Sequence, residues 1–155
     1  MPRALTVALA VVLLLLLGGL AERLIVTEEE RVELAYAAIV SAIREERAAD
    51  LATLIAPTLP YAGPAPVGSG DRQEALARFD ELFEAARDIA IIRHRPTEIT
   101  VQPGFATFRA PQFVRFRYGD MFVAYKMDAV LTFDRAGEHW LLSQVEITSL
   151  TPGIL

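Results

Sequence analysis

Two ionisable side chains are candidates for acid–base chemistry in this sequence, His94 and Asp128. His94 lies in a β-rich run on the face that it shares with Ile92, and the run predicts that this face points inward. In an apolar pocket, burial moves the pKa of a carboxyl group or an imidazole, which suits either one to transfer protons near neutral pH. A regular strand, however, points Asp128 away from the face of Tyr125 and Met127. We assign neither residue as catalytic, because His94 also fits a hydrogen-bonded core residue and Asp128 a solvent-facing one.

The composition excludes several other kinds of site. The 155 residues include no cysteine and two histidines, which excludes thiolate metal ligands, a cysteine nucleophile and disulfide bonds. We expect no metal and no cofactor. A formal net charge of -5 argues against binding to nucleic acid, which usually requires a basic surface. With 53% apolar and 23% charged residues, the chain is typical of a single globular domain.

Aromatic and methionine side chains on predicted inward faces favour a pocket between helices and sheet. Tyr36 lies on the apolar stripe of one predicted helix, and Phe79 and Phe83 lie on the stripe of another. Tyr125 and Met127 share one face of the longest predicted strand. Each tyrosine offers an apolar ring and a polar hydroxyl, a combination that suits the wall of a ligand site. The alternative is ordinary core packing of the same five residues, with both hydroxyls hydrogen-bonded.

Four arginines form two pairs at a spacing of two residues, Arg93 with Arg95 and Arg115 with Arg117. In a strand this spacing places both members of a pair on one face, so the two pairs predict a basic stripe. Such a stripe could bind an anionic partner, lipid headgroups or an acidic helix of a second protein. The alternative is a solvated outer face whose arginines pair locally with Asp and Glu.

The N-terminal part contains an apolar segment, residues 4–21, whose eighteen residues carry no charge. As a helix rising 1.5 Å per residue it would span about 27 Å, close to the ~30 Å hydrocarbon core of a bilayer. One arginine precedes the segment and three glutamates at 28–30 follow it, so the positive-inside rule places residues 1–3 in the cytoplasm. We therefore expect a single-pass anchor in the cell membrane and an extracytoplasmic C-terminal domain. A cleaved signal peptide is the alternative, because Gly19 and Ala21 fit a signal-peptidase site.

Capping signals predict three helices in the part that follows. Thr27 and Glu30 have the spacing of a capping box, which starts a first helix. Asp50 can cap a second, shorter helix. Asp71 with Glu74 has the same kind of signature and opens a third.

Strand signals follow the helices. Residues 56–70 are rich in Pro and Gly and predict a loop. Short β-rich runs, two of them separated by Pro111, then follow at residues 89–95, 98–102, 105–110, 113–118, 121–133 and 139–147. Helices first and strands afterwards favour an α+β fold, with three N-terminal helices packed on a curved antiparallel sheet.

Three segments carry a resemblance to a known superfamily: TEEERVELAYAAIVSAIREERAADLATLIAP at 27–57, RQEALARFDELF at 72–83 and VLTFDRAGEHWLLSQVEI at 130–147. They resemble the opening helices and the terminal hairpin of the nuclear transport factor 2-like (SnoaL-like) superfamily, over about residues 27–149 of the chain. The resemblance implies a cone-shaped domain with a pocket between helices and sheet, and a homodimer formed through the sheet. It implies no single activity, because the superfamily includes both polyketide cyclases and ketosteroid isomerases.

The predicted domain spans residues 27–150, after a linker at 22–26 and before a tail at 151–155. We expect a membrane-anchored, extracytoplasmic module that binds a protein partner or a small apolar ligand and is not an enzyme. The alternative is an isomerase, dehydratase or cyclase that uses His94 or Asp128 with a tyrosine hydroxyl on a small hydrophobic substrate. An open cone with either group inside favours the enzyme, and a cone filled by aromatic and methionine side chains favours the module.

Overall fold

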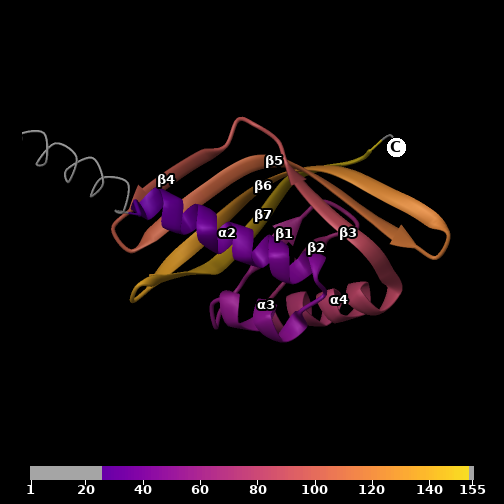
Figure 1. The fold of residues 1–155 in the computed structure, drawn as a ribbon, viewed down its shortest axis with the longest axis horizontal. Coiled ribbons are helices and arrows are strands. Elements are labelled where there is room, and N and C mark those ends of the chain that lie inside the picture. The colour runs from indigo at the N-terminus through magenta and orange to yellow at the C-terminus, as the bar shows by residue number, and fades with distance from the viewer. Residues whose placement is uncertain (1–25, 154–155) are drawn as a thin grey trace, which may run out of the picture.

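The computed structural model describes residues 26–153 as three helices and seven strands (Figure 1). In chain order these are α2 (Glu28–Arg44), α3 (Ala48–Leu54), β1 (Tyr61–Gly63), β2 (Gly68–Gly70), α4 (Arg72–Ala85), β3 (Ala86–Arg93), β4 (Glu98–Gln102), β5 (Phe105–Tyr118), β6 (Met121–Ala136) and β7 (His139–Pro152). The predicted membrane segment at residues 4–21 lies outside the described residues. Within residues 26–153, no helix is long and apolar enough to cross a membrane. The described part is an α+β domain.

Hydrogen bonds confirm two of the predicted helix starts. At α2, the Glu30 amide donates to the Thr27 hydroxyl at 3.2 Å, and the Thr27 amide donates to the Glu30 carboxylate at 2.7 Å. At α4, the Glu74 amide donates to the Asp71 carboxylate at 3.1 Å. Each bond satisfies an amide that has no partner within its own helix, so these side chains fix where the two helices begin.

The second helix begins earlier than predicted. α3 starts at Ala48, and no side chain caps it. Asp50 lies in its first turn, where its carboxylate pairs with the Arg47 guanidinium and faces the positive end of the helix dipole. The prediction of Asp50 as the cap was wrong, because the two alanines before it are strong helix formers and extend the helix towards Arg47.

Residues 56–70 contain a short hairpin, although the sequence predicted only a loop. β1 and β2 pair in antiparallel fashion, with Gly63 opposite Gly68. β1 also pairs with β7, and this pairing is parallel, with Tyr61 opposite Val145. The sheet is therefore mixed, and the prediction of a purely antiparallel sheet was wrong. The pairing joins segments far apart in the sequence, so no local pattern indicates it.

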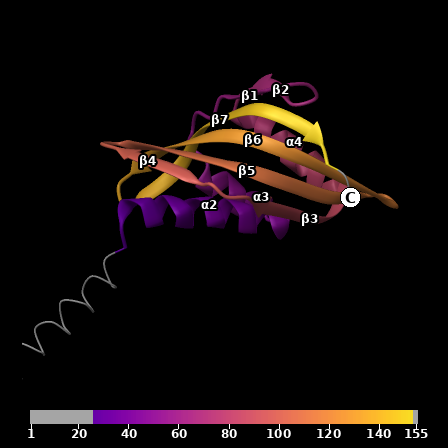
Figure 2. The same ribbon diagram turned by 90° about the horizontal axis from the view of Figure 1, so that it is seen from above.

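The seven strands form one sheet in the order β2-β1-β7-β6-β5-β3 (Figure 2). β4 also pairs with β5: it lies beside Phe105–Arg109, whereas β3 lies beside Gln112–Tyr118. β5 and β6 pair along the whole length of β5, from Phe105 opposite Asp134 to Tyr118 opposite Met121. Strands this long twist and bend. The β5–β6 pair therefore gives the sheet its curvature.

Pro111 does not separate two strands as predicted, because β5 continues through it. Its carbonyl oxygen accepts a hydrogen bond from the His94 amide at 2.7 Å. Pro111 therefore faces the edge where β5 changes its partner from β4 to β3. The nitrogen and carbonyl oxygen of one strand residue point to the same side, so the missing amide hydrogen of Pro111 falls in the gap between these two partners.

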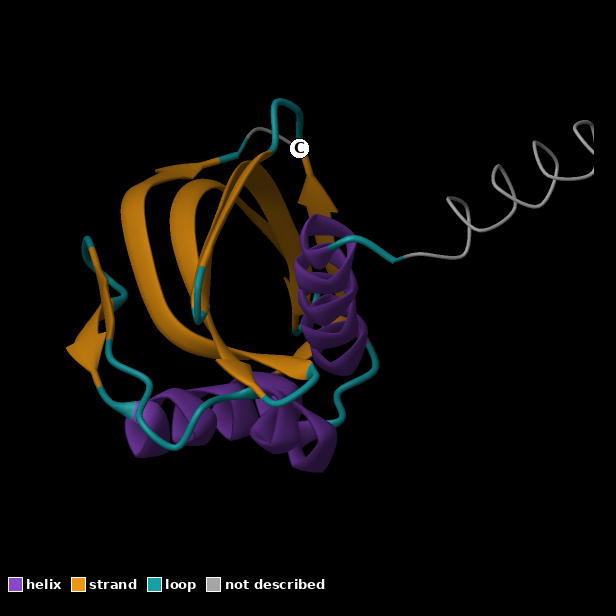
Figure 3. Cartoon of the chain, turned by 90° about the vertical axis from the view of Figure 1, so that its left-hand side faces the viewer, coloured by secondary structure: helices purple, strands orange, loops and turns teal. Residues whose placement is uncertain are grey.

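The sheet curves around a core that the helices close from the open side (Figure 3). α2 contacts β3, β4 and β7, while α3 contacts β7 and α4 contacts β3. The largest fully buried side chains come from both layers: Val32 of α2, Leu51 of α3, and Phe108 and Phe133 of the sheet. Full burial of such a side chain contributes roughly 1.5–3 kcal/mol. These contacts hold the helices on the sheet.

We expect Phe133→Ala to lower the free energy of unfolding by about 3–5 kcal/mol, because it leaves a void where a fully buried ring was packed. Phe105→Ala is the matched control, since Phe105 is 43% exposed and should cost less than about 1 kcal/mol. Urea unfolding followed by circular dichroism measures both changes. Equal losses for the two variants would contradict this account of the core.

Candidate functional site

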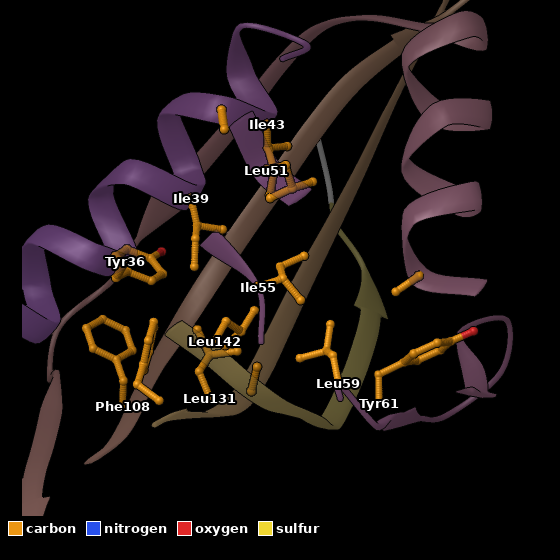
Figure 4. Close-up of a cluster of buried hydrophobic side chains, with 14 of the residues drawn as sticks. Tyr36, Ile39, Ile43, Leu51, Ile55, Leu59, Tyr61, Phe108, Leu131 and Leu142 are labelled. Carbon is orange, nitrogen blue, oxygen red and sulfur yellow. The ribbon is translucent and has the colours of Figure 1, made fainter. Parts of the chain in front are cut away.

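A cavity of about 480 Å³ lies between the helices and the inner face of the sheet. Its walls come from all three helices, from the β1–β2 hairpin and from β3, β5, β6 and β7. Most of the lining is aliphatic, including Ile39, Ile43, Leu51, Ile55, Leu131 and Leu142, which Figure 4 shows gathered around one space. The volume falls within the roughly 300–1,000 Å³ typical of small-molecule sites.

Four side chains with polar groups join this apolar lining: Tyr36, Tyr61, Arg78 and Gln112. Among the described residues, the lining contains no carboxylate and no imidazole. Within residues 26–153, no cluster of acidic or histidine side chains could hold a metal ion. The lining therefore supplies hydroxyl, amide and guanidinium groups.

Tyr36 reaches the cavity from the buried face of α2. Its ring stacks on Phe108 of β5, with ring centroids 4.4 Å apart and an angle of 16° between the planes. The hydroxyl is buried and has no hydrogen-bond partner. In Figure 4 it points towards Ile39 and the middle of the cluster. The stacked ring thus carries a buried hydroxyl that the surrounding core leaves without a partner.

Arg93 lies beside this ring and influences its hydroxyl. The guanidinium carbon is 5.8 Å from the Tyr36 ring centroid and 5.7 Å from that of Phe108. One guanidinium nitrogen donates to the Glu33 carboxylate at 3.0 Å, so the charge of Arg93 is balanced by α2. Burial raises the pKa of the Tyr36 hydroxyl above 10.0, and the nearby Arg93 charge offsets part of that rise. Tyr36 is therefore a neutral hydrogen-bond donor at physiological pH.

Gln112 is a second polar group of the lining. It is 4% exposed, although glutamine is usually found on the surface. In the sheet it lies between Arg93 of β3 and Met127 of β6, as their register partner. Gln112 therefore contributes a buried amide to the β5 wall of the cavity.

Tyr61 and Arg78 lie at the other end. The Arg78 guanidinium carbon is 5.7 Å from the Tyr61 ring centroid, and the Arg78 side chain is exposed. Figure 4 places Tyr61 across the cluster from Tyr36, with its hydroxyl pointing away from Leu59. The ring packs against Gly70, where an added Cβ would lie 2.6 Å from the Tyr61 hydroxyl. Gly70 is therefore needed for Tyr61 to lie in this position.

The structure places three of the five predicted pocket residues in the cavity lining and two outside it. Tyr36, Phe79 and Met127 lie in the cavity lining. Phe83 is buried next to Phe79, with ring centroids 5.9 Å apart, but lies outside the lining. Tyr125 is half-buried and is also not a lining residue. These side chains leave the cavity open.

The two candidates for acid–base chemistry lie outside the cavity. The Asp128 carboxylate is exposed and accepts a hydrogen bond from the Ser149 hydroxyl at 2.7 Å. His94 is exposed as well, and Ile92, which should share its face, is 49% exposed. The prediction of an inward face at Ile92 was wrong, because an irregularity between Arg87 and Ala90 shifts the register of β3.

The same shift separates the four arginines of the predicted stripe. Arg93 lies near the inner face, paired with Glu33. Arg115 pairs with Ala90 in the register, on the opposite face from the cavity-lining pair of Ile91 and Val114. Arg117 forms an ion pair with Asp88 at 3.0 Å, and Arg95 is exposed beyond the end of β3. Arg93 is therefore separated from Arg115 and Arg117.

Gln112, like Arg78, is a polar lining residue that sequence reasoning missed. The signal was present in the alternation of β5, where Ala106, Phe108, Ala110 and Val114 share one face with it. A lone amide in an otherwise apolar series of alternate residues indicates a polar group directed into the core. The predicted break at Pro111 divided the series and hid this pattern.

Comparison with known proteins bears on the fold. No family model matches this sequence, and no curated protein matches it. A conserved protein from Planctomyces limnophilus matches in structure with 15% identity and a TM-score of 0.71, over 81% of this chain and 98% of that one. A protein assigned as a dehydratase of the nuclear transport factor 2-like family, from Streptomyces avermitilis, matches with 17% identity and a TM-score of 0.71, over 83% and 97% of the two chains. The fold is nuclear transport factor 2-like.

A ketosteroid isomerase-like protein from Erwinia carotovora also matches, with 14% identity and a TM-score of 0.65, over 81% of this chain and 98% of that one. At such identities these matches show the fold alone. They agree with the cone-shaped arrangement predicted from the sequence, in which helices and sheet enclose a space. The chemistry of that space has to be read from this chain's own residues.

We expect Tyr36→Phe to raise the free energy of unfolding of the ligand-free protein by about 1 kcal/mol, because the variant removes a buried hydroxyl that has no partner. Tyr118→Phe is the control, since Tyr118 is 53% exposed and its hydroxyl is solvated. Urea unfolding near neutral pH measures the difference.

The same variants test the raised pKa of Tyr36. The folded state holds the phenol proton more tightly than the unfolded state, so this contribution to stability is complete below pH 10.0 and disappears as the pH rises through the folded pKa. The melting temperature of the wild type should therefore fall more steeply between about pH 9 and pH 11 than that of Tyr36→Phe. Parallel curves would contradict a raised pKa at Tyr36.

Proposed function

We propose that this domain binds a small, largely apolar molecule in the cavity and does not transform it. The observation that carries the proposal is the open space of about 480 Å³ in the middle of the core. Protein interiors normally pack as densely as organic crystals, and an unfilled cavity costs stability. A cavity of this size, walled by aliphatic side chains, favours an apolar occupant.

The polar groups of the lining favour binding over catalysis. A general acid or base must exchange a proton near neutral pH, as carboxylates and imidazoles do when burial tunes them. Tyr36 and Gln112 instead offer a neutral hydroxyl and an amide, which hold and orient a ligand. His94 and Asp128 are exposed and lie outside the lining. Structural neighbours include a protein assigned as a dehydratase and a ketosteroid isomerase-like protein, and both names support a small-molecule ligand.

We also propose that residues 4–21 tether the domain to the cell membrane, with residues 27–150 on the extracytoplasmic side. The support is the uncharged length of the segment, which matches the bilayer core, and the acidic run that follows it. A tethered binding domain would take up apolar molecules close to the lipid in which such molecules dissolve.

Methionine methyl groups provide a direct test of ligand binding. The full chain, labelled with 13C at its methionine methyl groups in detergent micelles, contains Met127 in the cavity lining and Met121, which is 65% exposed. Titration with 2-ethylnaphthalene should shift the Met127 methyl resonance, because an aromatic ring in the cavity changes its magnetic environment. The Met121 resonance is the internal control and should move little. Equal shifts of both, or none at Met127, would contradict binding in the cavity.

A cavity-filling variant sharpens this test. Ala129→Phe introduces a ring at a fully buried lining position of β6, and we expect it to weaken binding at least tenfold by occupying the space. Ala136→Phe introduces the same ring at an exposed position of the same strand and should bind as the wild type does. Loss of binding in both variants would point to a general disturbance of β6.

The tether has its own test. Leu14→Arg places a charge in the middle of the apolar segment, at a cost of about 3 kcal/mol for insertion, and should release the protein from the membrane fraction. Leu34→Arg adds the same charge at a 62% exposed position of α2 and should leave fractionation unchanged. Immunoblots of membrane and soluble fractions measure both. A wild-type chain recovered from the soluble fraction with Glu22 at its N-terminus would overturn the anchor in favour of a cleaved signal peptide.

A further inference from the structure

The face of α4 that borders the cavity carries one charged residue. Ala75, Arg78, Phe79 and Leu82 recur at intervals of three and four residues, and all four line the cavity. Residues at this spacing lie on one face of a helix. Among the described residues, Arg78 is the only charged member of the lining. Charged residues usually occupy the opposite face of such a helix, so an arginine on the cavity side needs an explanation.

Arg78 lies where the cavity meets solvent. It is exposed, and so is Pro66 in the turn of the β1–β2 hairpin, whereas the other described lining residues are buried or half-buried. We call the place marked by these two residues the mouth of the cavity. An arginine can lay its aliphatic stem along apolar surface while its guanidinium stays in water. Arg78 therefore brings a positive charge to the mouth.

The guanidinium is held in position, but its charge is not balanced by the protein. Its carbon lies 5.7 Å from the Tyr61 ring centroid, within the range of a cation–π contact. In the described part of the chain, Arg78 forms no ion pair with a carboxylate. Glu74 and Glu81 lie about one turn away on α4, yet neither pairs with it, and the Glu74 carboxylate lies against Gly70. The mouth thus presents an oriented cation to whatever enters the cavity.

The chemistry of this cation favours a carboxylate. A guanidinium presents a planar set of donors that matches the two oxygens of a carboxylate, and the two groups carry equal and opposite charge. A phosphate dianion would need a second cation, and the described lining contains none. Because Arg78 is exposed, a carboxylate beside it keeps part of its hydration, which avoids the cost of burying a charge.

We propose that the ligand of this cavity is an ionised carboxylic acid with an apolar body, whose body fills the cavity and whose carboxylate pairs with Arg78 at the mouth. Arg78 thereby selects an organic acid over a neutral or cationic molecule of the same shape. This inference rests on the proposed function, because it assigns the ligand class of the same cavity.

Three probes of nearly equal shape test the selection by charge: the carboxylate 3-(2-naphthyl)propanoate, the neutral amide 3-(2-naphthyl)propanamide and the cation 3-(2-naphthyl)propylammonium. Each is titrated at neutral pH into the full chain in micelles of an uncharged detergent, and binding is followed at the Met127 methyl group. The ring suits the apolar walls, and the short arm lets the charged end stay at the mouth. Comparison of each variant with the wild type at one detergent concentration cancels partition of the probes into micelles.

Variants of Arg78 locate the selection. Arg78→Gln should weaken binding of the carboxylate about two- to fivefold and leave the amide unchanged, because the pair is partly exposed to solvent. Arg78→Lys keeps the charge and should restore part of the loss. Arg78→Glu should weaken the carboxylate further and strengthen the cation about two- to fivefold, a reversal that a purely structural role of Arg78 would not produce.

Two further variants are the controls. Arg115→Gln removes the same charge from an exposed position on the opposite face of the sheet and should bind all three probes as the wild type does. Ala129→Phe occupies the cavity and should weaken all three. Unchanged Met121 and Met127 resonances without ligand show that the Arg78 variants and Arg115→Gln are folded.

The outcomes separate this inference from the proposed function. If Arg78→Gln binds the carboxylate as the wild type does, the role of Arg78 is overturned while cavity binding stands. Equal losses in Arg78→Gln and Arg115→Gln also overturn it, since net charge would then explain both. A carboxylate that binds Ala129→Phe as tightly as the wild type lies outside the cavity and overturns it as well. If neither the amide nor 2-ethylnaphthalene shifts Met127, the proposed function itself fails.

Discussion

The stacked pair of Tyr36 and Phe108 is the contact on which the arrangement of the site depends. It joins α2 to β5 with ring centroids 4.4 Å apart. Because Phe108 is fully buried, the position of Tyr36 is set by the core and not by solvent. The pair closes one end of the cavity with aromatic carbon and leaves one hydroxyl facing inward. Offset stacking of this kind adds about 0.5–1.5 kcal/mol beyond the burial of area.

The size of the cavity follows from small residues on the inner face of the sheet. Ala110 of β5 lies directly opposite Ala129 of β6, and both are almost completely buried. Two methyl groups at this point of the bend leave room that larger side chains would occupy. A continuous ladder of backbone pairs fixes β5 to β6, and α2 is held by contacts with β3, β4 and β7. These contacts oppose a collapse of the surrounding residues into the space. Ala129 lines the cavity, so its small side chain contributes to the open space.

Much of the fold could be predicted from the sequence where the signal is local. The capping signals at Thr27 and Asp71 predicted the correct helix starts, because each side chain accepts a hydrogen bond from the amide three residues on. The alternation in β6 predicted an inward Met127, which lines the cavity together with Ala129 and Leu131 of the same strand. Helices before strands predicted the α+β class.

The failures occurred where a distant partner decides the structure. The parallel pairing of β1 with β7 depends on residues more than eighty positions apart. The irregularity after Arg87 changes which residues of β3 face inward, and with it the surroundings of His94 and Arg93. At Pro111, a change of strand partner makes a proline acceptable within a strand. The prediction of the site was affected as well, because Gln112, a polar lining residue, directly follows Pro111 on β5.

The weak attachment of the β1–β2 hairpin has a consequence for traffic between the cavity and its surroundings. This hairpin supplies Tyr61 and, from its turn, Pro66 and Val67 to the cavity wall, yet its register with β7 covers only Tyr61 and Ala62. The opposite wall is held by a ladder of fourteen register pairs between β5 and β6. Local opening costs least where few backbone bonds must break. The hairpin is thus the part of the cavity wall whose separation from the sheet would break the fewest register pairs.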